Sequence, residues 1–486
     1  MKKGALLSAV LLVAPVLASA AAASTGVTPV TVTVDGGTIL NPGSSNGLGI
    51  NTDYWWDDQA NRPSGARPLS AALRDMNVSF ARYPGGEEAD GYLWSQPPYI
   101  TPAPHLARVS SGDWPSNDPS YWTPPASAKG DWAHAIYDFD EFMSDCRAVG
   151  CQPVLVVAED GIYKPAAPGG TSLTKPQALE AAAAWVRYAN VVKGYGIKYW
   201  EIGNETWLDT YMGANPGPVT YGKDVAEFSR VMKAVDPSIQ IGANGNTRAW
   251  FAGVLSQAAA DIDFLAVHSY PSYGMSFSTY QRSVLPTRTE TDNATDALAS
   301  FPVHKDRIFI AVTETGVLDA ANDLGSAMMN FTAIGDLLAD KRVRFSMMWT
   351  TRWVDTGSPS ATDALDASNN LYPMGRAVAI WGTYKRGRMV AATSNNAAVQ
   401  SYASQDPLTR QVSVFVVNKS GGRLAANVIL RRAGALTSVT RWVLKGTGPT
   451  DPKPTFTPVA ALRVSSGKVD MSLDPYSVTV LTGVAT

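Results

Sequence analysis

Two glutamates follow directly on short apolar runs that are typical of buried strands. The first ends the segment Trp200–Glu205, with the letters WEIGNE, and the second lies in Val312–Thr315, with the letters VTET. Two carboxyl groups on either side of a glycosidic bond can hydrolyse it. One protonates the leaving oxygen and the other attacks the anomeric carbon, at a separation of about 5–5.5 Å. Glu205 and Glu314 are therefore candidate catalytic groups; the competing interpretation is that they are ordinary solvated carboxylates.

Positioning two such groups requires a regular scaffold, and the chain carries the pattern of one. Eight apolar runs rich in β-branched residues alternate with segments of helical periodicity, as expected for parallel strands buried on both faces. The runs are Gly47–Asn51, Val78–Tyr83, Pro153–Ala158, Lys198–Ile202, Ile239–Ala243, Phe264–His268, Ile308–Thr313 and Arg344–Trp349. This alternation predicts an α/β fold, a (β/α)8 TIM barrel over residues 45–388. A doubly wound open sheet is the alternative, but the glycine-rich turn that usually follows its first strand is absent from the sequence.

Glu205 and Glu314 would end the fourth and seventh strands of this barrel, on opposite sides of the ring. The segments that follow strands two, four, six and eight are long and irregular: 92–130, 206–220, 271–285 and 352–372. In a (β/α)8 barrel these segments form the C-terminal face, where active sites lie. The sequence therefore places both glutamates at the mouth of a substrate cleft.

The pattern changes after about residue 388. Short alternating strands separated by Gly, Asn and Pro turns predict a C-terminal antiparallel β-sandwich over residues 389–486. The run Val30–Val34, within an N-terminal segment of residues 21–44, alternates in the same way and is expected to add a strand to it.

The first twenty residues resemble a signal peptide. Lys2 and Lys3 precede an apolar run from Ala5 to Leu17, and Ala18–Ala20 forms a small-residue cleavage site. The run is shorter than the roughly 20 apolar residues that a membrane-spanning helix needs. We therefore expect residues 1–20 to be removed and the mature protein to be secreted or periplasmic.

The two cysteines, Cys146 and Cys151, are five residues apart and could form a disulfide in an oxidising compartment or remain buried thiols. Without a nearby histidine they do not form a zinc site, and the sequence predicts neither a metal nor a cofactor. The formal net charge is −2 and basic residues are not clustered. There is accordingly no electrostatic argument for nucleic acid or a membrane surface as partner, and oligomeric state is not predicted.

An Asn-Glu pair ending strand four, with a second glutamate ending strand seven, resembles clan A of the retaining glycoside hydrolases. That resemblance implies Glu205 as acid/base, Glu314 as nucleophile and Asn204 as a hydrogen-bond partner of the sugar 2-hydroxyl. An oligo- or polysaccharide would be the substrate.

Other strand ends carry further candidates for contact with the sugar. The segment Val267–Pro271 is similar to the clan's His-x-Tyr segment, which implies that His268 and Tyr270 hold Glu314 ionised and oriented and line the sugar site. Trp349 matches the clan's platform tryptophan. A packed structural histidine and a core tryptophan are the competing interpretations. Trp207, just beyond Glu205, is a further candidate.

The segment Arg82–Gly86 (RYPGG), followed by Tyr92–Trp94 (YLW), narrows the resemblance to family 51 α-L-arabinofuranosidases. It resembles the second βα unit of that family, and Arg82 is expected to anchor the acid/base through a charged hydrogen bond. The resemblance extends over roughly residues 45–320 and is patchy.

Several positions that would contact the sugar depart from the family 51 pattern. They are Asn51–Asp53 in place of a glutamate, Glu87–Glu88 after the glycines, Glu159–Asp160 in place of an asparagine turn, and Thr313–Gly316 (TETG). Glu159 remains a candidate for sugar binding. The last motif and the two-domain plan also resemble families 39, 79 and 30. An α-L-arabinofuranoside is the first expected substrate; a glucuronide or xylan-type pyranoside, or a non-catalytic carbohydrate-binding protein, are the alternatives.

Overall fold

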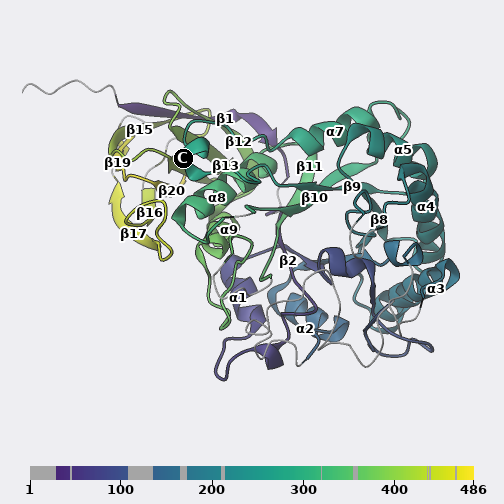
Figure 1. The fold of residues 1–486 in the computed structure, drawn as a ribbon. Coiled ribbons are helices and arrows are strands. Elements are labelled where there is room, and N and C mark those ends of the chain that lie inside the picture. The colour runs from purple at the N-terminus through teal and green to yellow at the C-terminus, as the bar shows by residue number, and fades with distance from the viewer. Residues whose placement is uncertain are drawn as a thin grey trace, which may run out of the picture.

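Eight parallel strands close into a barrel in the order β10-β11-β2-β3-β6-β7-β8-β9. Figure 1 shows the fold, with β2, β8, β9, β10 and β11 of the barrel labelled. The structure is a computed structural model that describes residues 29–43, 46–107, 135–164, 172–209, 214–318, 320–353, 360–434, 436, 439–462, 464–465 and 468–485. The predicted signal peptide lies outside these residues, as does most of the long segment 92–130. None of the helices in the described part of the chain is long and apolar enough to cross a membrane.

The eight barrel strands coincide with the eight predicted runs to within a few residues. They are β2 (Leu48–Asn51), β3 (Phe80–Tyr83), β6 (Gln152–Val157), β7 (Tyr199–Ile202), β8 (Gln240–Gly245), β9 (Phe264–Ser269), β10 (Phe309–Thr315) and β11 (Val343–Met348). All neighbouring pairs are parallel. The prediction of a (β/α)8 barrel is confirmed.

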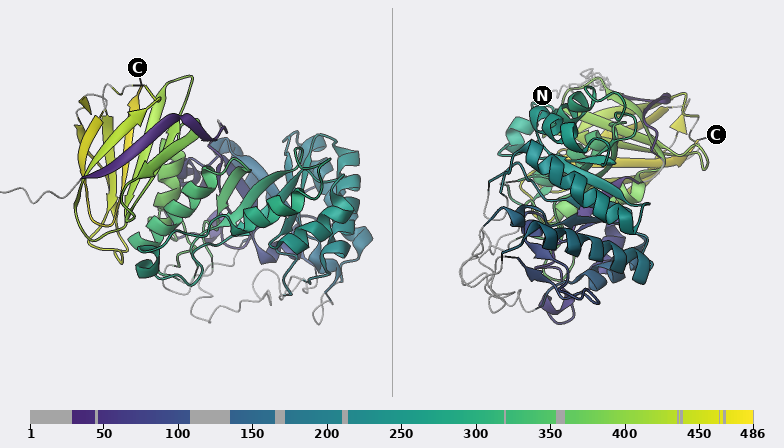
Figure 2. Two further views of the ribbon diagram at one scale, coloured as in Figure 1. Left: turned by 90° about the horizontal axis from the view of Figure 1, so that it is seen from above. Right: turned by 90° about the vertical axis from the view of Figure 1, so that its right-hand side faces the viewer.

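Helices surround the barrel, as Figures 1 and 2 show. They are α1 (Leu69–Met76), α2 (Phe139–Val149), α3 (Lys175–Val186), α4 (Pro218–Val235), α5 (Arg248–Ala258), α6 (Phe277–Tyr280), α7 (Thr289–Leu298), α8 (Leu324–Leu338) and α9 (Pro373–Tyr384). Local sequence sets their ends. Helix α2, for example, begins at a reciprocal cap between Asp138 and Glu141 and ends at Gly150, whose φ of 75° is left-handed.

Large side chains fill the interior of the barrel below its C-terminal ends. The stacked rings of Phe80 and Phe345 lie 4.4 Å apart, and Tyr199 packs 5.3 Å from Phe345. Gly242 leaves the space for Phe264, because a Cβ atom at Gly242 would lie 2.1 Å from that ring. The barrel therefore has a solid floor, on which the next layer of inward-pointing side chains rests.

The second domain is one ten-stranded sheet that curls over a common core. Its strands are β1 (Val30–Asn41), β12 (Arg388–Ser394), β13 (Val399–Gln405), β14 (Gln411–Asn418), β15 (Leu424–Arg431), β16 (Val439–Lys445), β17 (Thr455–Leu462), β18 (Val464–Ser465), β19 (Lys468–Leu473) and β20 (Ser477–Val484). Arg441 of β16 donates to the carbonyl of Ser472 on β19 (2.6 Å), which joins the two faces of the sandwich.

Strand β1 lies within this sheet, between β12 and β15, and is visible as the long purple strand in Figure 2. It pairs antiparallel with β12 and parallel with β15. The sandwich is therefore antiparallel except for the pair β1–β15.

The barrel and the sandwich share a continuous apolar core through α8 and α9. Trp381 of α9 packs 4.3 Å from Phe415 of β14 and 4.6 Å from Phe331 of α8. This packing fixes the sandwich against the outside of the barrel.

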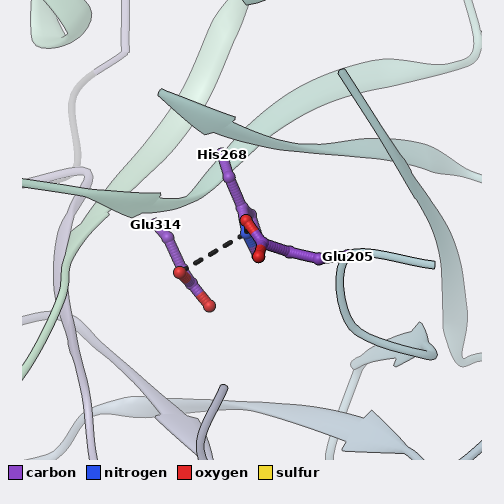
Figure 3. Close-up of side chains that lie close together, drawn as sticks. All are labelled: Glu205, His268 and Glu314. Atoms are coloured by element: carbon purple, nitrogen blue, oxygen red, sulfur yellow. Dashed lines mark hydrogen bonds and ion pairs between the residues drawn. The ribbon is translucent and has the colours of Figure 1, made fainter. Parts of the chain in front are cut away.

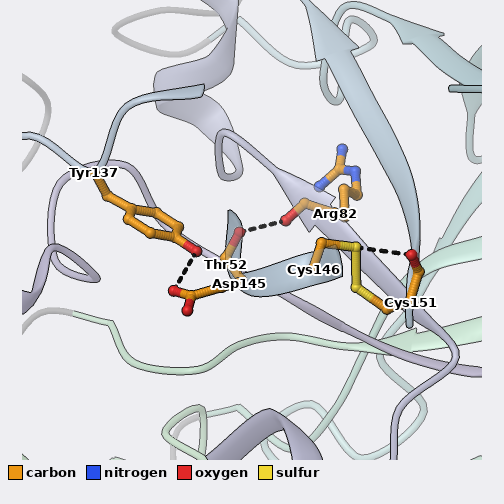
Figure 4. Close-up of a disulfide and its surroundings, with 6 residues drawn as sticks. All are labelled: Thr52, Arg82, Tyr137, Asp145, Cys146 and Cys151. Atoms are coloured by element: carbon orange, nitrogen blue, oxygen red, sulfur yellow. Dashed lines mark hydrogen bonds between the residues drawn. A yellow bond between two sulfur atoms is a disulfide. The ribbon is translucent and has the colours of Figure 1, made fainter. Parts of the chain in front are cut away.

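Cys146 and Cys151 form a disulfide between the last turn of α2 and the start of β6 (Figure 4). Nearby, Tyr137 donates to Asp145 (3.0 Å), and Thr52 donates to the carbonyl of Arg82 (2.8 Å). The disulfide thus lies at the outer edge of the barrel, beside strand β3.

Candidate active site

Two-residue alternation along the strands decides which side chains point into the barrel. The interior floor includes Phe80, Tyr199, Ala266 and Met347. Two positions further along the same strands come Arg82, Glu201, His268 and Trp349. The strand pattern therefore brings a cation, a carboxylate, an imidazole and an indole into one layer above the floor.

Glu314 reaches this layer by a local irregularity. Along β10, Ala311 belongs to the interior cluster and Val312 to the outer core. Strict alternation would therefore turn Glu314 outward with Val312. The pairing of β10 with β9 shifts register between Val312 and Glu314. The shift brings Glu314 level with His268, and its carboxylate faces Arg82 and Tyr270.

The Arg82 guanidinium lies fully buried at the centre of the layer. Its Nε donates to Glu201 Oε2 (2.9 Å) and its Nη2 to Glu201 Oε1 (3.3 Å). Its Nη1 donates to Glu314 Oε1 (2.7 Å) and to Asn51 Oδ1 (2.9 Å), and Nη2 also donates to Asn204 Oδ1 (2.8 Å). One cation thereby ties together strands β2, β3, β7 and β10.

Glu314 is held at both carboxylate oxygens. Arg82 donates to Oε1, and the Tyr270 hydroxyl donates to Oε2 (2.6 Å). Burial raises the pKa of Glu314 above its usual range; His268 and Arg82 lower it in part, and the Glu205 carboxyl adds to the rise. The fixed donors favour the ionised form that a nucleophile needs, against the cost of burying it.

Glu205 lies in a tight turn that follows β7. Gly203 has a φ of 67°, and a Cβ atom there would lie 2.5 Å from Thr206 Oγ1, so the position requires glycine. Glu205 itself has a φ of 46°, an uncommon conformation for a residue with a side chain. The side chain of Glu205 is 28% exposed, against 5% for that of Glu314, and therefore reaches the mouth of the barrel.

His268 connects the two glutamates (Figure 3). Its Nδ1 lies 2.9 Å from Glu205 Oε1 and 3.4 Å from Glu314 Oε2. One side-chain atom from each of the three residues lies within 4.8 Å of the others. This spacing allows one carboxylate to attack a bound atom while the other carboxyl group transfers a proton. It leaves no room for the attacking water that fits between two carboxyl groups about 6.5–9.5 Å apart.

The same three residues are the one set of His, Cys, Asp or Glu side chains, within the described residues, whose spacing could suit a metal ion. Two features oppose that assignment. Both oxygens of Glu314 already accept hydrogen bonds, and the Arg82 guanidinium lies 2.7 Å from one of them. A divalent cation would be repelled at this position, so we assign no metal to it.

Three other predicted residues join the group. Asn204 uses its carbonyl oxygen on Arg82, which leaves its NH2 group to donate to a ligand. The Trp207 ring stands edge-on to His268, with centroids 5.6 Å apart. Trp349 lies against Gly86, where an added Cβ atom would come 2.5 Å from the indole.

Glu159 does not join the group. It follows β6 at a position where alternation turns the side chain away from the barrel axis, and its carboxyl faces Asp160 and Asp224. It is fully buried, and burial together with these carboxyls raises its pKa. The prediction that Glu159 binds the sugar was wrong, because its side chain lies on the outer side of β6 and not on the side that faces the barrel axis.

The predicted partner of Arg82 was also wrong. Among the described residues its side-chain hydrogen bonds go to Glu314, Glu201, Asn204, Asn51 and the carbonyl of Gly85, not to Glu205. Sequence reasoning overlooked Glu201, which is fully buried and the main partner of Arg82. A charged residue inside an apolar strand, four positions before Glu205, was the available signal, since buried charges require partners.

Comparison with known sequences supports the family resemblance. Residues 72–283 match the sequence model described as "Alpha-L-arabinofuranosidase 1 domain". An intracellular exo-alpha-(1->5)-L-arabinofuranosidase 1 of Bacillus subtilis is 25% identical over 229 residues, which cover 42% of this chain and 39% of the Bacillus protein. A probable alpha-L-arabinofuranosidase C of Aspergillus fumigatus is 26% identical over 38% of this chain and 34% of its own length. The similarity is thus confined to less than half of the length of these relatives.

Solved structures show the same fold over nearly the whole chain. The α-L-arabinofuranosidase of Thermotoga maritima, in complex with arabinose, superposes with a TM-score of 0.70 at 17% identity, covering 94% of this chain and 100% of that one. CelM2, a bifunctional glucanase-xylanase from a metagenome library, gives 0.65 at 18% identity, covering 94% and 99%. The resemblance to α-L-arabinofuranosidases is confirmed over residues 72–283, and the solved structures share the fold over nearly the whole chain.

Removing the buried guanidinium tests its structural role. In Arg82→Met, Glu201 and Glu314 lose the cation closest to them inside the barrel, so we expect the free energy of unfolding to fall by about 3–5 kcal/mol. Urea unfolding measures this change. The control is Arg67→Met, which breaks the exposed pair with Asp75 and is expected to cost about 1 kcal/mol or less. Equal losses in the two variants would contradict the arrangement described here.

Proposed function

We propose that this protein is an exported, retaining glycoside hydrolase that acts on oligo- or polysaccharides, with α-L-arabinofuranosides as its first substrates. The observation that carries the proposal is the pair Glu205 and Glu314, with carboxylate oxygens within 4.8 Å of each other at the C-terminal end of a barrel. Separations of this order belong to retaining rather than inverting enzymes.

The geometry supports a double displacement. In the first step Glu205 protonates the glycosidic oxygen, and the Glu314 carboxylate attacks the anomeric carbon to form a glycosyl ester. In the second step the Glu205 carboxylate takes a proton from water, the water oxygen attacks the same carbon, and the ester bond to Glu314 breaks. Asn204 can donate its NH2 group to the sugar 2-hydroxyl, while Arg82 and Tyr270 keep Glu314 oriented.

The names of the matched relatives support an arabinofuranoside as substrate. The matched model and both relatives are described as α-L-arabinofuranosidases. The matched residues 72–283 include Arg82, Asn204, Glu205 and His268, and end before Glu314.

A pyranoside is the second candidate, and a specific observation favours it. Asn51 stands where family 51 is expected to carry a glutamate, and its amide is committed: Oδ1 accepts from Arg82, and Nδ2 donates to the carbonyls of Thr313 (2.9 Å) and Met348 (3.1 Å). Asn51 therefore has no acceptor of the kind a carboxylate would offer to a sugar hydroxyl. The fold also occurs in a glucanase-xylanase.

Two independent features support export. Residues 1–20 have the charge, apolar run and small residues of a signal peptide. The Cys146–Cys151 disulfide belongs to an oxidising environment, since cytosolic thiols are kept reduced.

Removing each carboxyl separately tests the two roles. Glu314→Gln should abolish hydrolysis of every accepted aryl glycoside, because no nucleophile remains. Glu205→Gln should slow substrates with poor leaving groups by about 10²–10⁴-fold and activated aryl glycosides far less in the first step, because these do not need a proton. The matched control is the exposed Glu180→Gln, which should retain the wild-type rate. Wild-type hydrolysis by Glu314→Gln would refute the proposal.

A panel of nitrophenyl glycosides tests the substrate. We expect release of nitrophenol from the α-L-arabinofuranoside at a kcat/KM at least about tenfold above that for the β-xyloside and β-glucuronide, roughly 1.4 kcal/mol of discrimination. Activity on pyranosides alone would reject the arabinofuranoside. Tight oligosaccharide binding without any bond cleavage would instead indicate a non-catalytic carbohydrate-binding protein.

A further inference from the structure

His268 is surrounded by carboxylates on both sides of its ring. Nδ1 faces Glu205 Oε1 at 2.9 Å and Glu314 Oε2 at 3.4 Å. Nε2 faces Glu201 Oε1 at 3.8 Å and has no closer hydrogen-bond partner in the described part of the chain. The ring is fully buried, with Trp207 against its edge.

This arrangement selects the protonated form of the ring. A neutral imidazole carries one donor and one acceptor nitrogen, whereas an imidazolium donates from both. While Glu205 is ionised, as in the second step, an acceptor nitrogen here would face a carboxylate oxygen, whichever tautomer formed. The pKa of His268 agrees with a protonated ring. Burial lowers this pKa, but the charges and hydrogen bonds of Glu314, Glu201 and Glu205 outweigh the effect of burial and raise the pKa to about 9.

Glu201 is the carboxylate on the far side from the cleft. It is fully buried and cannot reach a substrate. Besides facing His268, it accepts both hydrogen bonds from Arg82 described above, and Thr313 Oγ1 donates to it at 3.4 Å. Arg82 and the other charges hold the pKa of Glu201 below its usual value despite burial. One anion therefore contacts both cations of the site.

Glu201 is one of the two anions that balance the positive charges of the site. Arg82 and a protonated His268 supply two positive charges, and Glu201 and Glu314 supply two negative ones. When Glu314 is converted to an ester its charge is lost, and the imidazolium then has Glu205 as its remaining partner on the cleft side. The imidazolium would stabilise the Glu205 carboxylate in the step where that group must act as a base.

We propose that Glu201 is a positioning residue that keeps His268 protonated and aimed at Glu205 whenever Glu205 is ionised, so that Glu205 can serve as the base of the second step. The role in catalysis rests on the proposed function. The protonation of His268 does not, because it follows from the folded structure alone. The groups that face this histidine are Glu201 of β7, Glu205 in the turn after it, Glu314 of β10, Arg82 of β3 behind the two carboxylates, and the Tyr270 hydroxyl bonded to Glu314.

Nuclear magnetic resonance can observe this proton without any substrate. The chain has only four histidines, so ¹⁵N-histidine labelling gives few signals, and His268→Asn identifies those of His268. In the wild type we expect the ring to titrate at about pH 9. In Glu201→Gln the midpoint should fall by about one unit or more, because an opposite charge is removed. In Glu201→Asp, which keeps the charge, it should stay closer to the wild-type value.

A matched control is available on the next residue of strand β9. Ser269 donates to Glu290 Oε2 of helix α7 at 2.9 Å, and Glu290 does not face His268. Glu290→Gln should leave the His268 midpoint unchanged. A wild-type midpoint below pH 7 would overturn the proposal even if Glu201→Gln failed to fold. So would an unchanged midpoint in a folded Glu201→Gln variant.

Kinetic measurements test the part of the proposal that concerns catalysis. With an activated aryl glycoside, for which the second step limits kcat, Glu201→Gln should lower kcat about tenfold and kcat/KM by less. The alkaline limb of kcat should also move to lower pH. A purely structural role would lower both parameters through loss of folded enzyme and leave the pH profile in place. If the wild type hydrolyses no glycoside, the proposed function fails, while the titration of His268 still decides the protonation.

Discussion

The buried guanidinium of Arg82 is the interaction on which the rest of the site depends. A cation inside a barrel is stable only if anions and dipoles surround it. Here Glu201, Glu314, Asn204 and Asn51 do so. These partners come from strands β2 and β10 and from β7 with the turn after it. Neutralising one charge therefore also fixes the spacing of the nucleophile candidate and of the residue that precedes the acid/base candidate. Stability and active-site geometry are thus consequences of the same set of hydrogen bonds.

Two local features complete the arrangement. The register shift in β10 turns Glu314 inward, and the left-handed turn at Gly203 and Glu205 lifts the second carboxyl to the cleft mouth. Without the first, Glu314 would face the outer helices. Without the second, Glu205 would not extend beyond the layer in which Glu201 lies buried. The two glutamates therefore lie at different depths, which suits one for attack and the other for proton exchange with a leaving group or with water.

The fold could be predicted because each strand carries its own apolar signal and the barrel follows from their number and alternation. The positions of Glu205 and Glu314 at strand ends could be predicted for the same reason. The direction in which each side chain points was harder to predict from the sequence than the fold. Glu159 lies just beyond the end of β6, one residue out of phase with the inward-pointing positions of that strand. The sequence does not show which residues of the strand point inward until its pairing with β3 is known. The partners of Arg82 depend on how the ring closes, and Glu201 was overlooked because its partners come from β3 and β9, far along the chain.

The central claim is that Glu314 forms a bond to the sugar, while Glu205 handles protons with the aid of His268. The most direct test is to trap that bond with the 2-deoxy-2-fluoro glycosyl fluoride of whichever sugar the protein accepts. The fluorine slows both steps, and the good leaving group allows the first to proceed. Mass spectrometry of the intact protein should show one added glycosyl group, and peptide mapping should place it on Glu314. Labelling of Glu205 instead, or an unlabelled protein that releases a product of inverted anomeric configuration, would contradict the account.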